Sequence, residues 1–190
     1  MFMSVFKMDF ESLNNCENLL MVDNGESMHK WVTTLLDSKR SEKNILYRVD
    51  KEKDSIYIYI QSDAPIIVNN IKKIGIKFVK QFELRSTNGK VMFKLRCHPT
   101  HNVGNKRMYI LNKEDRLEYV KRYLGDCLDI DNVFESSTHT NRIKENSRVT
   151  FCDFVGTGTV KNVDLFMTKV QKGIGKCKCY GAGMLMFKEI

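Results

Sequence analysis

The chain has 190 residues and carries 31 Lys and Arg against 23 Asp and Glu, a formal net charge of +8. Hydrophobic residues make up 42% of it, which excludes wholesale disorder, fits one or two small domains and leaves no apolar run near the roughly 20 residues of a membrane span. The charge fits either a polyanionic partner or simply a basic protein.

The first half of the chain is predicted to contain four strands and one helix. Residues 2–8 form a β-prone run, and a polar stretch follows over residues 11–25. The helix is indicated by an apolar stripe with helical spacing, for which Ser27 is a plausible N-cap. That stripe consists of Met28, Trp31, Val32, Leu35 and Leu36. Three further strands are predicted at residues 45–49, 56–60 and 77–84, the first two of them joined as a hairpin.

The second half is predicted to repeat this order with a second helix. A helix over residues 113–124 has Asn112 as its N-cap and Gly125 just past its end, and another over residues 163–170 is closed by Gly173. Four strands are predicted at residues 90–96, 133–142, 149–160 and 184–187.

The two halves together predict an α+β protein of tandem ferredoxin-like domains with antiparallel sheets. The turn composition near residues 86–89 divides the chain into an N-terminal domain of residues 1–87 and a C-terminal domain of residues 88–190.

The six cysteines have no paired C-x-x-C pattern, and the one close pair, Cys177 and Cys179, is a weak metal signal. His98 and His101 flank Pro99, which disfavours a helix presenting both imidazoles. Residues 1–9 lack the apolar core of a signal peptide, so we expect a cytoplasmic chain with reduced thiols that pack as small hydrophobes. We predict no metal site and no cofactor.

The most specific feature is a glycine loop near the C-terminus, in which Gly173 and Gly175 are followed after five residues by Gly181 and Gly183. Its spacing matches neither a P-loop nor a dinucleotide-binding fingerprint. Glycines permit positive φ and close approach of the backbone, and exposed amides beside Lys176 would suit a phosphodiester. A helix C-cap followed by a flexible hairpin is an equally acceptable interpretation.

The loop resembles the C-terminal signature of the RAMP superfamily of CRISPR-associated RNA-binding proteins, and the chain as a whole resembles the CasE family, the endoribonuclease subunit of type I-E Cascade. Several segments carry the resemblance, in the family's order and at its spacing. They are residues 28–31 (MHKW), 46–49 (LYRV), 60–65 (IQSDAP), 93–99 (FKLRCHP), 105–107 (NKR), 110–111 (IL) and 173–185 (GIG to GAGML).

The resemblance implies an RRM/RAMP-like protein that binds the stem-loop of a CRISPR repeat in precursor crRNA. It would cleave at the 3′ base of the stem by metal-independent attack of a 2′-OH, leave a 2′,3′-cyclic phosphate, and remain bound as a Cascade subunit. His29 matches the catalytic His of the family, and Lys30 stands where Arg or Gln is common. Metal-free RNA cleavage needs a proton acceptor, a proton donor and positive charge, and a His at a helix start lies where the dipole favours a phosphate.

For RNA binding we single out basic residues and the glycine loop, because A-form RNA is recognised mainly through its shape and backbone. Each basic residue could equally be a solvated surface charge. The candidates are Arg96, Lys106, Arg107, Arg142, Lys144, Arg148, Gly173, Gly175, Lys176, Lys178, Gly181 and Gly183.

Two alternatives remain at this point. The family often has a Tyr three residues before the catalytic His, where this chain has Glu26, so a non-cleaving repeat-binding subunit or mimic that docks on Cascade or crRNA is the second hypothesis. A general RNA-binding ferredoxin-like module is the third, although the sequence has no aromatic RNP-type motif.

Overall fold

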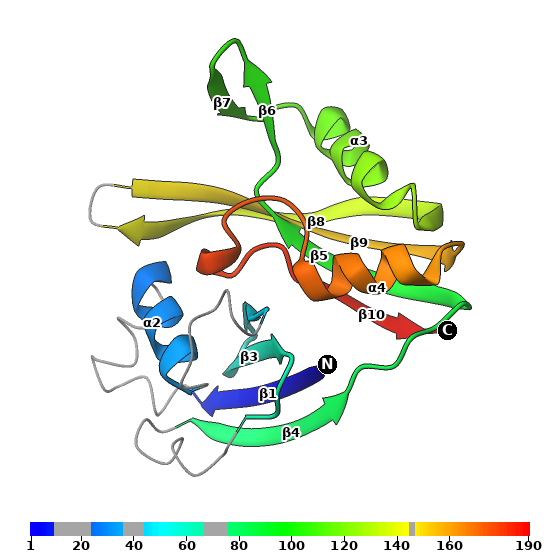
Figure 1. The fold of residues 1–190 in the computed structure, drawn as a ribbon. Helices are drawn as coiled ribbons and strands as arrows, with labels where there is room; N and C mark the ends of the chain where they lie inside the picture. Colours follow the sequence, from blue (N-terminus) through cyan, green and yellow to red (C-terminus); the bar gives the residue numbers. More distant parts are fainter. Residues whose placement is uncertain (10–23, 36–43, 67–75, 145–146) are drawn as a thin grey trace. The chain divides into compact units, whose positions relative to one another are not determined.

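The computed structural model describes residues 1–9, 24–35, 44–66, 76–144 and 147–190. They form two compact units, each with its own four-stranded sheet (Figure 1). Unit 1 comprises residues 1–84, 141–148 and 179–181, and unit 2 comprises residues 85–140, 149–178 and 182–190. Residues 141–148 and 179–181 therefore cluster with unit 1. The predicted division into residues 1–87 and 88–190 assigns both segments to the C-terminal domain.

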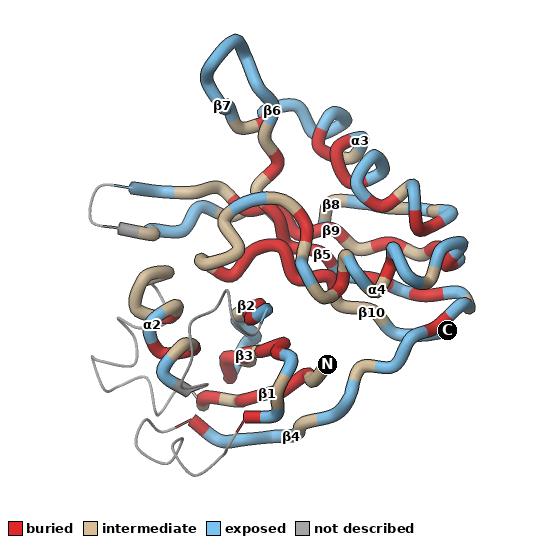
Figure 2. The backbone as a smooth tube through the Cα atoms, in the orientation of Figure 1, coloured by how far each residue is buried: buried red, intermediate tan, exposed pale blue. Residues whose placement is uncertain are grey.

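Unit 1 is built on strands β1 (Phe2–Asp9), β2 (Leu46–Lys51), β3 (Ser55–Ser62) and β4 (Lys77–Glu83), with helix α2 (Gly25–Leu35). The strand order is β2-β3-β1-β4, and every pairing is antiparallel. Figure 2 shows β1 and β3 largely buried, whereas the edge strand β4 is exposed along most of its length. The four predicted strands are confirmed, while the residues between β3 and β4, 67–75, lie outside the described part.

The core of unit 1 lies between α2 and one face of this sheet. Met28 and Val32 are fully buried on α2, as the helical apolar stripe predicts. Trp31 packs edge-on against Phe6 of β1, with ring centroids 6.1 Å apart, and Ile58 of β3 belongs to the same cluster. The side chain of Leu35 and residue Leu36 lie outside the described part.

Unit 2 contains β5 (Lys90–Cys97), β8 (Leu128–Lys144), β9 (Ser147–Val160) and β10 (Leu185–Glu189), with the helices α3 (Lys113–Leu124) and α4 (Val163–Lys172). The tip of the β8–β9 hairpin clusters with unit 1. The strand order, β10-β5-β9-β8, places the four strands as in the first sheet, so both sheets have the ferredoxin-like arrangement and the predicted α+β fold class is confirmed.

Both helices of unit 2 pack on the sheet face that carries Phe93. Phe166 of α4 contacts Phe187 of β10 at 5.0 Å between ring centroids, and Phe187 pairs with Phe93 in the ladder. Opposite Phe93 on β9 lies Gly156, where an added Cβ would be 2.5 Å from the Phe93 ring. Because Gly156 has no side chain, the Phe93 ring can occupy the space beside its backbone.

Three details of the secondary structure differ from the sequence prediction. Strand β8 begins at Leu128, five residues earlier than expected. A hairpin of β6 (Thr100–Val103) and β7 (Lys106–Tyr109) and a 3-10 turn, η3 (Lys178–Tyr180), were not predicted. The hairpin lacks the apolar alternation that reveals a buried strand, since most of its residues are exposed.

Among the helices of the described residues, none has the length and apolar character needed to cross a membrane.

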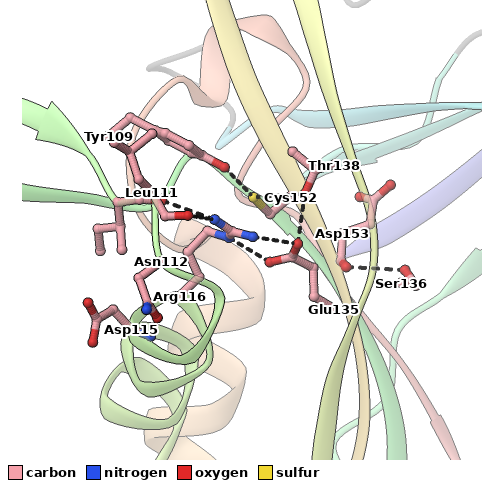
Figure 3. Close-up of polar contacts among 11 residues, drawn as sticks. Tyr109, Leu111, Asn112, Asp115, Arg116, Glu135, Ser136, Thr138, Cys152 and Asp153 are labelled. Carbon is pink, nitrogen blue, oxygen red and sulfur yellow. Dashed lines mark hydrogen bonds and ion pairs between the residues drawn. The ribbon is translucent and has the colours of Figure 1, made fainter.

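A buried ion pair attaches α3 to the sheet of unit 2. Arg116, 8% exposed, donates from Nε and Nη2 to the carboxylate of Glu135 on β8 at 2.6 and 2.8 Å, and from Nη1 to the carbonyls of Ile110 and Leu111 (Figure 3). Asn112 caps the same helix, as predicted, by accepting from the amide of Asp115. The guanidinium thus joins a helix, a strand and the chain that leads into the helix.

We expect Arg116→Met to lower the free energy of unfolding by roughly 3–5 kcal/mol, because it leaves a buried carboxylate without its partner. Urea denaturation measures the change. Lys121→Met on the exposed side of α3 is the matched control and is expected to cost less than about 0.5 kcal/mol. Equal losses in both variants would contradict the role of the pair.

The free energy of unfolding should also depend on pH through the carboxyl group of Glu135. Hydrogen bonds from Arg116 hold the pKa of this carboxyl below its ordinary value of 4.5, so the folded state binds the proton more weakly than the unfolded chain. The stabilisation is therefore present above about pH 4.5 and is lost as the pH falls through the lowered pKa. We expect the stability difference between wild type and Glu135→Gln to be largest near pH 7 and to shrink toward pH 3, measured by urea denaturation at each pH. A difference that is constant with pH would contradict this assignment.

Candidate nucleic-acid interface

The helix that carries His29 begins at an asparagine. The side-chain carbonyl of Asn24 accepts from the backbone amides of Glu26 and Ser27 at 2.9 and 3.3 Å. The prediction of Ser27 as the N-cap is therefore wrong, and α2 starts before it, at Gly25. The two amides at the helix start are thus satisfied by the protein, while the positive end of the helix dipole remains beside them.

His29 and Lys30 lie in the second turn of α2, off the stripe that packs on the sheet. His29 is half-buried and Lys30 is exposed. The ammonium of Lys30 pairs with the carboxylate of Glu26 at 3.2 Å, one helical turn earlier, with both side chains well exposed. Pairs of this kind contribute only about 0.3–0.5 kcal/mol, so an incoming phosphate can replace Glu26 as the partner of Lys30.

Two contacts within unit 1 place other segments beside the start of this helix. The hydroxyl of Tyr47 lies 3.2 Å from the carbonyl oxygen of Gly25 and 2.9 Å from that of Cys179, which joins the helix start to the end of the glycine loop. Asn24 forms a parallel bridge with Arg142, at the tip of the β8–β9 hairpin. The structure therefore brings the backbone of Arg142 next to the cap of the helix that carries His29.

In unit 2 the glycine loop is closed by its own backbone hydrogen bonds. Gly173, which has φ of 70°, ends α4 by donating to the carbonyl of Lys169. Ile174 donates to the carbonyl of Gly183 at 2.8 Å, and Gly183 donates to the carbonyl of Arg96 on β5 at 2.6 Å. These amides are occupied by protein carbonyls, which corrects the expectation that they face a phosphodiester.

Gly175 shows what the loop approaches closely. It has φ of 76°, and an added Cβ would lie 2.8 Å from the hydroxyl of Tyr119 on α3. Burial raises the pKa of the Tyr119 phenol, so the group facing the loop is neutral at physiological pH. The close approach predicted for the glycine backbone is therefore present, and the bulky partner is a tyrosine of the protein itself.

Arg96 is directed into the protein. Its side chain is 8% exposed and donates from Nε and Nη2 to Asp153 at 2.8 and 2.9 Å, and Asp153 also accepts from the hydroxyl of Ser137. The two charged residues are directly opposite each other on β5 and β9. A guanidinium buried against a carboxylate in this way serves the sheet, so we do not retain the expectation that Arg96 contacts RNA.

The other predicted RNA-binding residues fall in separate places. Lys106 and Arg148 are exposed, at the β6–β7 hairpin and the β8–β9 hairpin tip. The backbone of Lys144 belongs to β8, while its side chain lies outside the described part. Gly181, in unit 1, packs against Tyr47. Five other predicted residues line one cavity of about 520 Å³ in unit 2. They are Arg107, Gly173, Gly175, Lys176 and Lys178.

The same cavity is lined by residues that the sequence did not point to. The lining also includes His101, Tyr119, Arg122, Tyr123 and Lys169. Two tyrosines four residues apart on α3, with an arginine between them, are the signal that could have revealed this surface, because such residues share one side of a helix.

The described cysteines are all free thiols. Cys97, Cys127 and Cys152 are buried, as expected of thiols that pack as small hydrophobes, whereas Cys177 and Cys179 are half-buried and Cys16 lies outside the described part. Burial raises the pKa of Cys97 well above its ordinary value, which keeps this thiol protonated and unreactive. In the part of the chain that the structure covers, no three His, Cys, Asp or Glu side chains gather as metal ligands would.

The chain is similar in sequence to one protein family and in fold to several solved structures. Residues 1–188 match a family model described as CRISPR associated protein. The fold is similar to that of Thermus thermophilus Cse3 bound to an RNA representing a pre-cleavage complex, with a TM-score of 0.84, 14% identity and coverage of 99% of this chain and 100% of that one. It is also similar to the CRISPR-associated protein Cas6e from Escherichia coli str. K-12, with a TM-score of 0.76 and 16% identity.

A chain of a CRISPR RNA-guided surveillance complex has the same fold, with a TM-score of 0.71 and 16% identity. Coverage is 100% of both chains for this match and for Cas6e. No curated protein sequence matches the chain. At these identities the solved structures establish the fold, including the tandem ferredoxin-like arrangement.

We expect Gly175→Ala to destabilise the protein more than Gly104→Ala. Both glycines have positive φ, 76° and 57°, so both variants carry a backbone strain of about 1–2 kcal/mol. An added Cβ at Gly104 meets nothing within 4 Å, whereas at Gly175 it meets the Tyr119 hydroxyl, which adds about 1–3 kcal/mol of overpacking. Thermal and urea denaturation of both variants measure the difference, and equal losses would contradict the close approach to Tyr119.

Proposed function

The chain belongs to the CRISPR-associated protein family, and on that premise we propose that it is an endoribonuclease that processes precursor crRNA. It binds the stem-loop of a CRISPR repeat and cleaves once at the 3′ base of the stem, without a metal ion. It then stays on its product as a cytoplasmic subunit of Cascade, as the match to a chain of a surveillance complex supports.

The observation that carries the proposal is the position of His29. This half-buried imidazole lies in the second turn of α2, beside Lys30 and close to the positive end of the helix. Arg142 reaches the helix start through its bridge with Asn24. A proton acceptor, a movable ammonium and a helix dipole are thus placed on one element, as cleavage through a 2′-OH requires.

The reaction needs no group beyond these and water. His29 takes the proton of the 2′-OH, and the 2′ oxygen forms a bond to phosphorus while the bond from phosphorus to the 5′ oxygen breaks. Lys30, released from Glu26, stabilises the extra negative charge of the phosphorane. The 5′ oxygen leaves with a proton from solvent, and the products are a 2′,3′-cyclic phosphate and a free 5′-OH.

The cavity of unit 2 supports RNA binding independently of the chemistry. Arg107, Lys176 and Lys178 lie around it, and A-form RNA is held mainly by basic contacts to its phosphates. Repeat RNA and the other Cascade subunits are accordingly the proposed partners.

One observation favours a second candidate, a repeat-binding subunit of the same family that does not cleave. The carboxylate of Glu26 lies 3.2 Å from the ammonium of Lys30 and partly neutralises it. If this pair persists when RNA binds, the scissile phosphate meets a carboxylate where the reaction needs positive charge.

Cleavage of a labelled CRISPR repeat hairpin in EDTA under single-turnover conditions tests the proposal. We expect wild type to cleave it and His29→Ala to lose about 100-fold or more in rate while its binding is retained, because one general base contributes about 10²- to 10⁴-fold. Lys53→Ala, an exposed charge at the turn between β2 and β3, is the control and should cleave at the wild-type rate.

Tight binding without cleavage by wild type would overturn the enzyme proposal and support the non-cleaving subunit. Glu26→Gln then tests the cause. It is expected to raise the cleavage rate of an active enzyme by releasing Lys30, and to give cleavage in a subunit that the Glu26–Lys30 pair alone keeps inactive.

A further inference from the structure

The charged residues that line the cavity of unit 2 are all basic. It lies between the β6–β7 hairpin, α3 and the glycine loop, and its volume of about 520 Å³ falls within the range of small-molecule sites, roughly 300–1,000 Å³. Among the described residues no Asp or Glu contributes to this lining. The charged residues that do are Arg107, Arg122, Lys169, Lys176 and Lys178, with His101 beside them.

Not all of these cations are equally available to a ligand. Lys169 donates to the carboxylate of Asp126 and to the carbonyl of Tyr123, so it fixes the end of α3 to α4. Arg107, Arg122 and Lys176, by contrast, have no carboxylate partner in the part of the chain that the structure describes. Their charge is directed to solvent or to a ligand, and an anion in the cavity would neutralise it.

The cavity also contains an aromatic surface. The rings of Tyr119 and Tyr123 are 4.6 Å apart between centroids and tilted by 43°. The guanidinium of Arg122 lies over both, 5.8 and 5.7 Å from the two centroids. Tyr119 is buried against Gly175, while Tyr123 is 38% exposed and offers its ring to the cavity. Aromatic rings and arginine planes beside free cations are the groups on which proteins stack unpaired bases.

We propose that this cavity is a binding site for one unpaired nucleotide. Its base stacks on Tyr123 beside Arg122, and its phosphate is bound by Lys176 and Arg107. A paired base inside an A-form stem cannot present its face in this way, so the nucleotide is a single-stranded one. The inference deepens the proposed function and rests on it only for the source of the nucleotide, an RNA chain rather than a free nucleotide.

Equilibrium binding of short RNA by the full chain tests the site. The probes are a labelled tetra-adenylate and a labelled tetranucleotide of abasic residues, which has the same phosphates without the bases. Wild type is expected to prefer tetra-adenylate by about 5- to 150-fold, the range for one stacked base. Tyr123→Leu and Arg122→Ala should abolish that preference, while Tyr123→Phe, which keeps the ring, should retain it.

Lys121→Ala is the matched control, since it removes a neighbouring charge of α3 that lies outside the cavity lining. It is expected to keep the preference for tetra-adenylate, and circular dichroism should show all the variants folded. Equal binding of the two probes by wild type would overturn the proposal, as would a loss of preference in Lys121→Ala equal to that in Arg122→Ala.

Competition with AMP identifies the source of the nucleotide. Displacement of tetra-adenylate by AMP at a similar concentration assigns the site to free nucleotides, and resistance to AMP assigns it to an RNA chain. Hairpin cleavage by Tyr123→Leu separates this inference from the proposed function. If wild type cleaves the hairpin but binds the two probes equally, the nucleotide site alone is overturned. If wild type binds tetra-adenylate but neither binds nor cleaves the hairpin, only the endoribonuclease is overturned.

Discussion

The buried side chain of Arg116 connects helix α3, strand β8 and the segment that leads into α3. A guanidinium with little access to water must satisfy its donors inside the protein, and here they reach a carboxylate on β8 and two carbonyls ahead of α3. The same side chain lies over the ring of Tyr109, at the end of the β6–β7 hairpin. Because α3 carries Tyr119 and Arg122, the orientation of the cavity lining depends on this one buried group.

The groups proposed for chemistry and those proposed for RNA binding lie in different units of the chain. The groups suited to chemistry lie on α2 in unit 1, where a capped helix presents His29 next to a weakly held ammonium. The groups suited to holding RNA surround the cavity in unit 2, where backbone hydrogen bonds close the glycine loop. Substitution of Arg107 or Tyr123 is therefore expected to leave the helix that carries His29 intact.

Sequence patterns predicted the elements whose signals are local. The helix from Lys113 to Leu124 has its cap, its acidic first turn and its final glycine all within the same short segment. Arg96 could not be assigned in this way, because its partner Asp153 lies 57 residues along the chain and only the sheet brings the two together. The role of Gly175 could be predicted only in part. The glycine pattern indicates a close approach of the backbone to another group, but it does not identify that group as Tyr119.

The pairing of Arg96 with Asp153 also has a consequence for folding. Both residues occupy interior positions of β5 and β9, directly opposite each other. A slip of one residue between these strands would place Asp153 opposite Leu95 or Cys97, leaving two desolvated charges apart at a cost of several kcal/mol. The ion pair thus favours the observed alignment of the two strands, in addition to the buried apolar face of the sheet.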